Sequence, residues 1–124
     1  MRVAALLLAL TACTPAIAAE PVLELRVGPR AIHATTEDIR EVLVLESHPP
    51  KIQLRTGPAF SRAVADFTAA SIGEEAVLSI CGEEVMRPRI MERISSPGMI
   101  LAPIPPEKLD GFVQVLTGEA SCPG

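Results

Sequence analysis

Only three aromatic side chains occur in this sequence of 124 residues: Phe60, Phe67 and Phe112 are its rings, and Trp and Tyr are absent. Any hydrophobic core must therefore be built mainly from Val, Leu, Ile, Met and Ala, and a chain of this length forms one small domain. Proteins usually hold nucleobases, sugar rings and quaternary amines by aromatic stacking. The composition thus predicts a small aliphatic core and argues against ligands of these three classes.

The balance of charges argues against nucleic acid as a partner. The chain carries 11 Lys and Arg residues against 15 Asp and Glu residues, a formal net charge of -4, and it has no basic run. Contacts with phosphates need a cluster or stripe of basic residues. We therefore expect no nucleic-acid partner.

The N-terminal residues 1–19 have the pattern of a secretory signal peptide. One arginine precedes an apolar run over residues 3–12, and small residues that include Ala16 and Ala18 follow it. One cation, a short apolar stretch and small residues before a cleavage point are typical of such signals. The run is too short for a permanent membrane anchor, which needs about 20 apolar residues. We expect residues 20–124 to be exported to the periplasm as one domain.

A second processing route competes with ordinary cleavage. Residues 10–13 read Leu-Thr-Ala-Cys and resemble the lipobox of bacterial lipoproteins, which makes Cys13 a candidate lipidation site. We favour ordinary cleavage after residue 19, because cleavage before Cys13 would leave a signal of very short length. The mature chain is therefore expected either free in the periplasm or tethered to a membrane by lipid.

Two cysteines remain after either route, Cys81 and Cys122. Outside the cytosol an even pair is typical of a disulfide. Such a bond would tie the C-terminal tail to the body of the domain and stabilise a small core. The alternative is a reactive or redox thiol, although no second Cys lies at Cys-x-x-Cys spacing.

Hydrophobic periodicity predicts a mixture of strands and helices. Apolar residues alternate with polar ones, or run together, in short segments between turn residues, which is typical of strands. These segments are 22–27, 41–45, 51–56, 75–80, 83–89 and 99–101. Apolar residues at helical spacing predict two helices, one from Pro58 to a stop near Gly73 and one that ends at Gly118. The pattern indicates an α+β domain, with a small mixed or antiparallel sheet and two helices packed on one face.

Several short sequences follow one another in an order that matches a known protein family. They are Glu-Asp-Ile at 37–39, Pro-Lys-Ile-Gln-Leu at 50–54, Ala-Asp-Phe-Thr at 65–68, Ala-Val-Leu-Ser-Ile at 76–80 and a predicted closing helix at 107–118. Through their order and spacing the chain resembles the head subdomain of the first periplasmic domain of SecD. SecD is an accessory membrane subunit of the bacterial Sec protein-export machinery.

The resemblance to the SecD head implies a protein-binding role without enzyme activity. It implies transient contact with exported or unfolded polypeptides in the periplasm. The tight Asp-Gly turn of the family reads Cys81-Gly82 here, which fits a disulfide with Cys122. The sequence after the signal contains no segment long enough to cross a membrane. We therefore do not expect the proton-coupled motion of SecD from this chain.

The sequence lacks the motifs of common enzymes. It contains no Gly-x-Ser-x-Gly elbow, no Ser-x-x-Lys pair and no Gly-rich phosphate loop. His33 and His48 are the only imidazoles, and a zinc site would need more Cys and His at short spacing. We expect no catalytic residue, no cofactor and no metal. Two alternatives stay open, namely a structural envelope lipoprotein held through Cys13 and an enzyme that uses Cys81.

The predicted return strand of the Cys81-Gly82 hairpin is a candidate peptide-binding edge. An unfolded peptide can add to an exposed strand edge through main-chain hydrogen bonds, while shallow apolar pockets hold its side chains. Methionine side chains adapt to varied partners, although they also fill cores. The candidate contact residues are Val85, Met86, Arg87, Arg89 and Met91.

Charged residues bracket the same hairpin. Glutamates occur at 74, 75, 83 and 84, and arginines at 87, 89 and 93. Exposed charges of opposite sign at this spacing favour surface ion pairs over a binding site for an acidic partner. Charged side chains on an edge strand also discourage aggregation through that edge.

Overall fold

The structure, a computed structural model, describes residues 20–123. The signal peptide predicted over residues 1–19, with the lipobox at 10–13 and its Cys13, lies outside the described residues. No helix within the described range is long and apolar enough to cross a membrane. The described residues cover the whole region that we expect to be exported except residue 124.

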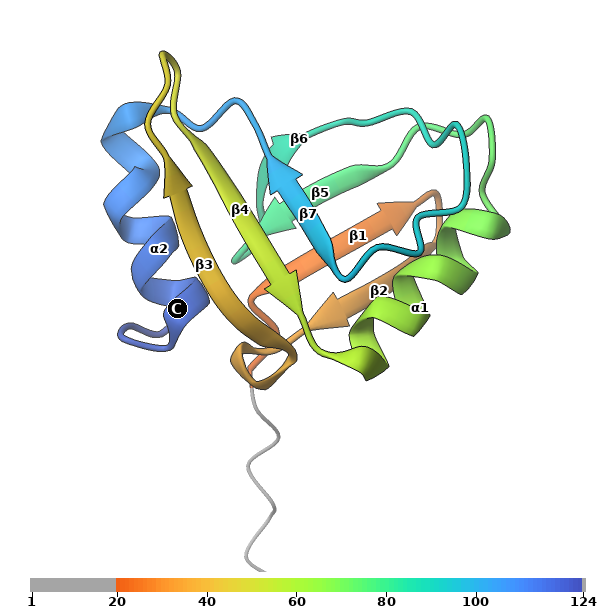
Figure 1. Ribbon diagram of the computed structural model, residues 1–124, viewed down its shortest axis with the longest axis horizontal. Coiled ribbons are helices and arrows are strands. Elements are labelled where there is room, and N and C mark those ends of the chain that lie inside the picture. The colour runs from red at the N-terminus through yellow and green to blue at the C-terminus, as the bar shows by residue number, and fades with distance from the viewer. Residues whose placement is uncertain (1–19, 124) are drawn as a thin grey trace, which may run out of the picture.

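Strands and helices follow one another without a regular alternation (Figure 1). The strands are β1 (Leu23–Val27), β2 (Arg30–Ala34), β3 (Ile39–Leu45), β4 (Lys51–Thr56), β5 (Val77–Ile80), β6 (Glu83–Met86) and β7 (Gly98–Leu101). The helices are α1 (Pro58–Ala69) and α2 (Leu109–Thr117), with single 3-10 turns at η1 (Thr36–Asp38) and η2 (Pro106–Lys108). These elements confirm the predicted α+β class.

The strands form two antiparallel sheets, whereas the sequence predicted a single sheet. One sheet has the strand order β2-β1-β5-β6 and the other has the order β3-β4-β7. Figure 1 shows the strands of the two sheets crossing each other. Alternation along a strand marks the face that it buries but does not identify its neighbours. The split into two sheets was therefore not readable from the periodicity.

A two-residue turn joins β1 to a strand that the sequence did not predict. Val27 pairs with Arg30, so Gly28 and Pro29 alone make the turn, and Gly28 has a φ of 58°. Glycine adopts this left-handed conformation without steric cost. The predicted strand over residues 22–27 thus continues through this turn into β2, which pairs along the whole of β1.

One hydrophobic core lies between the two sheets and the helices. Ile52 and Leu54 of β4 are fully buried while their neighbours are exposed, as the predicted alternation requires. The three phenylalanines are buried as expected, two of them on α1 and one on α2. The core is otherwise aliphatic, so its stability depends on close packing of branched side chains.

Each helix lies beside one edge strand of one sheet. Helix α1 packs against β2, and helix α2 packs against β3. Figure 1 shows the helices on opposite sides of the domain, not side by side on one sheet face as the sequence predicted. The other two edge strands are β6 and β7. Among the described residues neither helix packs closely against them.

The ends of the helices agree with the sequence in one case and differ in the other. Helix α2 ends before Gly118, which takes the predicted left-handed conformation with a φ of 83°. Helix α1 ends earlier than predicted, at Ala69, and Gly73 with a φ of 87° belongs to the turn that follows. Ser71, which the predicted helix would include, is buried in that turn, where its hydroxyl accepts a hydrogen bond from Arg30 at 3.0 Å.

The hairpin between β5 and β6 turns at Cys81-Gly82, as predicted. Both residues have a positive φ, 52° for Cys81 and 79° for Gly82, as in the type I′ turns that favour tight hairpins. A disulfide joins Cys81 to Cys122, with a Cα to Cα distance of 5.4 Å. The C-terminal tail is thereby tied to the turn that leads into β6.

Candidate functional site

A groove of about 450 Å³ lies between β6 and β7, the two edge strands without a helix beside them. Met86 and Pro88 line it from the side of β6, and residues 98–100 line it from the side of β7. We call this hollow the β6–β7 groove.

The floor of the β6–β7 groove is apolar. Leu25 on β1, Val64 on α1 and Leu78 on β5 line it, and their exposed fractions are 6%, 2% and 2%. Ile94 and Ser96, from the segment before β7, also line the groove. None of the described residues that line it carries a charge. Gln53 of β4 and Ser96 are its polar lining side chains. The groove therefore suits neutral, mainly apolar groups and offers an ion no partner of opposite charge.

Beyond Met86, the chain continues β6 in extended pairing with the segment that precedes β5. The N–H of Ile90 donates to the carbonyl oxygen of Glu74 at 2.9 Å. The N–H of Ala76 donates to the carbonyl oxygen of Pro88 at 2.8 Å. In an antiparallel pair, the residue between two such bonds turns its own N–H and C=O away from the partner. Arg89 therefore presents both backbone groups to the outside of the sheet, and we call the segment 86–90 the β6 edge.

Arg87 lies in the same outward register. Its neighbours Met86 and Pro88 face Leu78 and Ala76, so Arg87 also turns its N–H and C=O outward. Pro88 has no N–H, but its nitrogen faces inward, and the outer side of the β6 edge loses no donor. Within residues 20–123 neither of the two outward N–H groups has a hydrogen-bond partner.

The edge of β7 is partly occupied by a side chain. The Ser96 hydroxyl accepts a hydrogen bond from the N–H of Gly98 at 3.2 Å and donates to the carbonyl oxygen of the same residue at 3.1 Å. A side chain that binds outward backbone groups in this way blocks pairing with another strand. The β6 edge is therefore the more open of the two.

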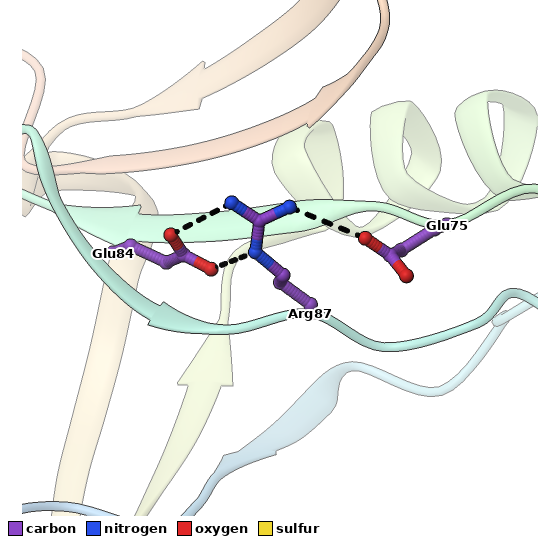
Figure 2. A network of polar contacts seen from close by, with 3 residues as sticks. All are labelled: Glu75, Glu84 and Arg87. Atoms are coloured by element: carbon purple, nitrogen blue, oxygen red, sulfur yellow. Dashed lines mark hydrogen bonds and ion pairs between the residues drawn. The ribbon is translucent and has the colours of Figure 1, made fainter.

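Both arginines of the β6 edge bind partners within the domain, and Figure 2 shows the ion pairs of Arg87. Arg87 donates to both oxygens of Glu84, at 3.1 Å for the Nη2 contact, and through Nη1 to Glu75 at 3.3 Å. These pairs, with Glu84 the stronger partner, raise the pKa of Arg87 above its ordinary value. Arg89 donates through Nη1 to the carbonyl oxygen of Gly73 at 3.1 Å. Both arginines thus have partners within the domain, as the sequence led us to expect for surface charges.

The structure brings together only part of the predicted contact set. Met86 lines the groove, and Arg87 and Arg89 contribute the outward backbone groups. Val85 is half-buried against the core. Met91 is 72% exposed and does not line the groove. Peptide contact by these five residues stays a prediction.

The opposite wall of the groove was not predicted from the sequence. Met99 and Ile100 line it from β7, and Ile100 is 51% exposed. A signal for them was present, since Met99, Ile100 and Leu101 form an uninterrupted apolar run. Neighbouring residues of a strand point to opposite faces, so such a run either is buried on both faces or exposes an apolar side chain. Because β7 is an edge strand, its apolar run exposes the side chain of Ile100.

The disulfide borders a second hollow, of about 350 Å³, between α2 and the β5–β6 turn. Its charged lining residues, Lys108 and Glu83, form an ion pair with each other. A nucleophilic thiol at Cys81 would require reduction of the disulfide. His33 is exposed, with Nε2 3.3 Å from an oxygen of Glu24. No group of three or more potential metal ligands occurs in the described part of the chain.

Comparison with solved structures reveals a shared fold. The chain is similar to SecDF, described as a membrane component that enhances protein export, with a TM-score of 0.63 and 15% sequence identity over 80% of this chain and 63% of that one. A crystal structure of SecDF in a super-membrane-facing form gives a TM-score of 0.63 and 15% identity over 78% of this chain and 18% of that one. The chain thus spans less than two thirds of either protein. No protein-family model and no curated protein sequence matches it. The chain is therefore similar to the periplasmic region of SecDF at the level of the fold.

Proposed function

We propose that this chain is an exported, non-enzymatic protein-binding module that takes up an extended segment of an unfolded or emerging polypeptide in the periplasm. The observation that carries the proposal is the pair of unpartnered, outward backbone groups at Arg87 and Arg89, next to an uncharged apolar groove. A peptide added to such an edge gains affinity from main-chain hydrogen bonds and tolerance of sequence from shallow side-chain contacts.

Two further features support this proposal. The fold is similar to that of SecDF, which is described as enhancing protein export, although fold alone does not carry function. The Cys81 to Cys122 disulfide is consistent with an oxidising compartment outside the cytosol. Both features agree with a role in handling exported polypeptides.

A proline at position 89 tests the proposal directly. The N–H of Arg89 points out of the sheet, so the R89P variant removes a docking donor without breaking a main-chain hydrogen bond inside the domain. It also removes the guanidinium and its bond to Gly73. We expect R89P to bind an end-blocked peptide of alternating Val and Thr, about seven residues long, at least about tenfold more weakly than the unaltered protein. Chemical-shift titration of the labelled protein measures the affinity and maps the contact.

The matched control is the R89A variant. It removes the guanidinium and its bond to Gly73 but keeps the backbone N–H, so we expect affinity within about threefold of the unaltered protein. Equal binding by R89P and R89A would show that the peptide does not use the β6 edge. Failure of the unaltered protein to bind any extended peptide would refute the proposed function.

A further inference from the structure

We infer that the β6–β7 groove selects polypeptide segments with a two-residue period, in which one face of the incoming strand is apolar and uncharged while the other face is unrestricted. This inference rests on the proposed function, since it concerns which segments the β6 edge accepts. It follows from the pleat of the edge, from the chemistry of the groove and from the ion pairs on the opposite side.

The pleat of the β6 edge fixes where the incoming side chains fall. Met86, Pro88 and Ile90 share one face with the core, because Met86 pairs with the buried Leu78 and Ile90 is 4% exposed. Arg87 lies between them on the opposite face. A strand docked on this edge adopts the same pleat, so every second side chain lies over the groove and the others lie beside the arginines.

The groove side favours neutral apolar groups. Met86 and Met99 line it from opposite strands, and methionine side chains adapt to residues of different shape. An ammonium or carboxylate placed here would lose its hydration without gaining a charged partner. Ile94 and Ile100 are 39% and 51% exposed, and an incoming apolar side chain would remove part of this surface from water. Binding should therefore change little with salt concentration.

The opposite side sets no such requirement. Arg87 is paired with Glu75 and Glu84, and all three side chains are about half exposed, at 56%, 54% and 43%. Side chains of the docked strand on this face would stay in contact with water. Because charges of both signs are present and already paired, polar, acidic and basic residues are tolerated there about equally.

The groove therefore fits one class of segment, namely stretches that form amphipathic strands once a polypeptide has folded. While the polypeptide is unfolded, such stretches expose the apolar side chains that a sheet later buries. A uniformly charged or randomly patterned segment lacks a continuous apolar face for the groove. The recognised feature is the period of the pattern, not a particular residue.

Two end-blocked peptides of identical composition test the inference. One alternates Val and Thr, and the other contains the same residues in blocks. Both offer the same main chain and the same hydrophobic content, so only the pattern differs. We expect the unaltered protein to bind the alternating peptide at least about tenfold more tightly, measured by titration calorimetry or chemical-shift titration. Equal affinities would overturn the inference and leave the proposed function standing, whereas binding of neither peptide would remove the proposed function itself.

A lysine scan of the alternating peptide tests the two faces separately. Lysine in place of the central Val is expected to lower affinity at least about tenfold, and lysine in place of a central Thr to change it less than about threefold. Equal losses at both positions would contradict a one-sided groove.

A charge introduced into the groove provides a second, independent measurement. The M86K variant is expected to prefer a peptide with Glu in place of the central Val over the peptide with Lys there, because the new ammonium lies over the groove face. The M86L variant is the matched control and is expected to disfavour both charged peptides. If M86K does not discriminate between the two charged peptides, Met86 does not contact the groove-facing residue and the inferred register is wrong.

Discussion

The C81S/C122S variant is expected to unfold with a free energy about 4 kcal/mol lower than that of the unaltered protein. The disulfide joins residues 41 positions apart, and the closed loop contains β6, β7 and α2. Without the bond, the unfolded chain regains the conformational freedom that the loop had removed. Urea unfolding of the oxidised protein and of the variant, each fitted with its own slope, measures the difference. For so small a domain this is a large share of the total stability.

The conformation of Cys81 provides a control for this measurement. Its φ of 52° is unusual for a residue with a side chain and costs roughly 1 kcal/mol. Asparagine tolerates this conformation better than serine does. The C81N/C122S variant should therefore recover part of the loss, up to about 1 kcal/mol, relative to C81S/C122S. If both variants were as stable as the unaltered protein, the disulfide would contribute nothing to the free energy of unfolding.

Replacing Leu101 by Ala is expected to lower the free energy of unfolding by about 3 kcal/mol. Leu101 is fully buried and pairs with the fully buried Ile52 of β4. Truncation removes apolar contacts and leaves a cavity that a tightly packed aliphatic core fills only in part. Urea unfolding with a probe of secondary structure measures the loss.

The neighbouring residue supplies the matched control. Ile100 lies on the same strand but is 51% exposed, so I100A is expected to change stability by less than about 0.5 kcal/mol. The same substitution should weaken peptide binding, because Ile100 lines the groove. A similar loss of stability in both variants would show that Ile100 is held in the core and is not free to bind a partner.

Much of the local structure was readable from the sequence. The Thr-Gly-Pro start of α1, the Gly118 end of α2 and the Cys81-Gly82 turn each follow from conformations that Pro and Gly favour. The buried faces of β1 and β4 follow from strict alternation. These signals are local because the conformational preferences of Pro and Gly, and the alternation of faces along a strand, depend only on neighbouring residues of the chain.

The candidate site was readable only in part. Methionines and arginines on the return strand marked the β6 edge, and Met86 does line the groove. The opposite wall was missed, because β7 follows β6 only after a long irregular segment. The outward direction of the Arg89 N–H and C=O could not be predicted from the sequence either, because it depends on the pairing register with the segment before β5. The Cys81-Gly82 turn sets the register of a hairpin, but this register shifts between Leu78 and Ser79, and the sequence did not reveal that shift.

By itself, the sequence determined an aliphatic α+β domain, its principal turns, two helices and the pairing of its last two cysteines as the expected disulfide. Only the tertiary structure decided that the strands divide into two sheets, that each helix lies beside one edge of one sheet, and that β6 and β7 remain as the edges of a groove. The physical reason is the range of the interactions. Helix ends and turns depend on local backbone energies, whereas the pairing of β4 with β7 is decided by loop closure and by shared burial of side chains that are distant in the chain.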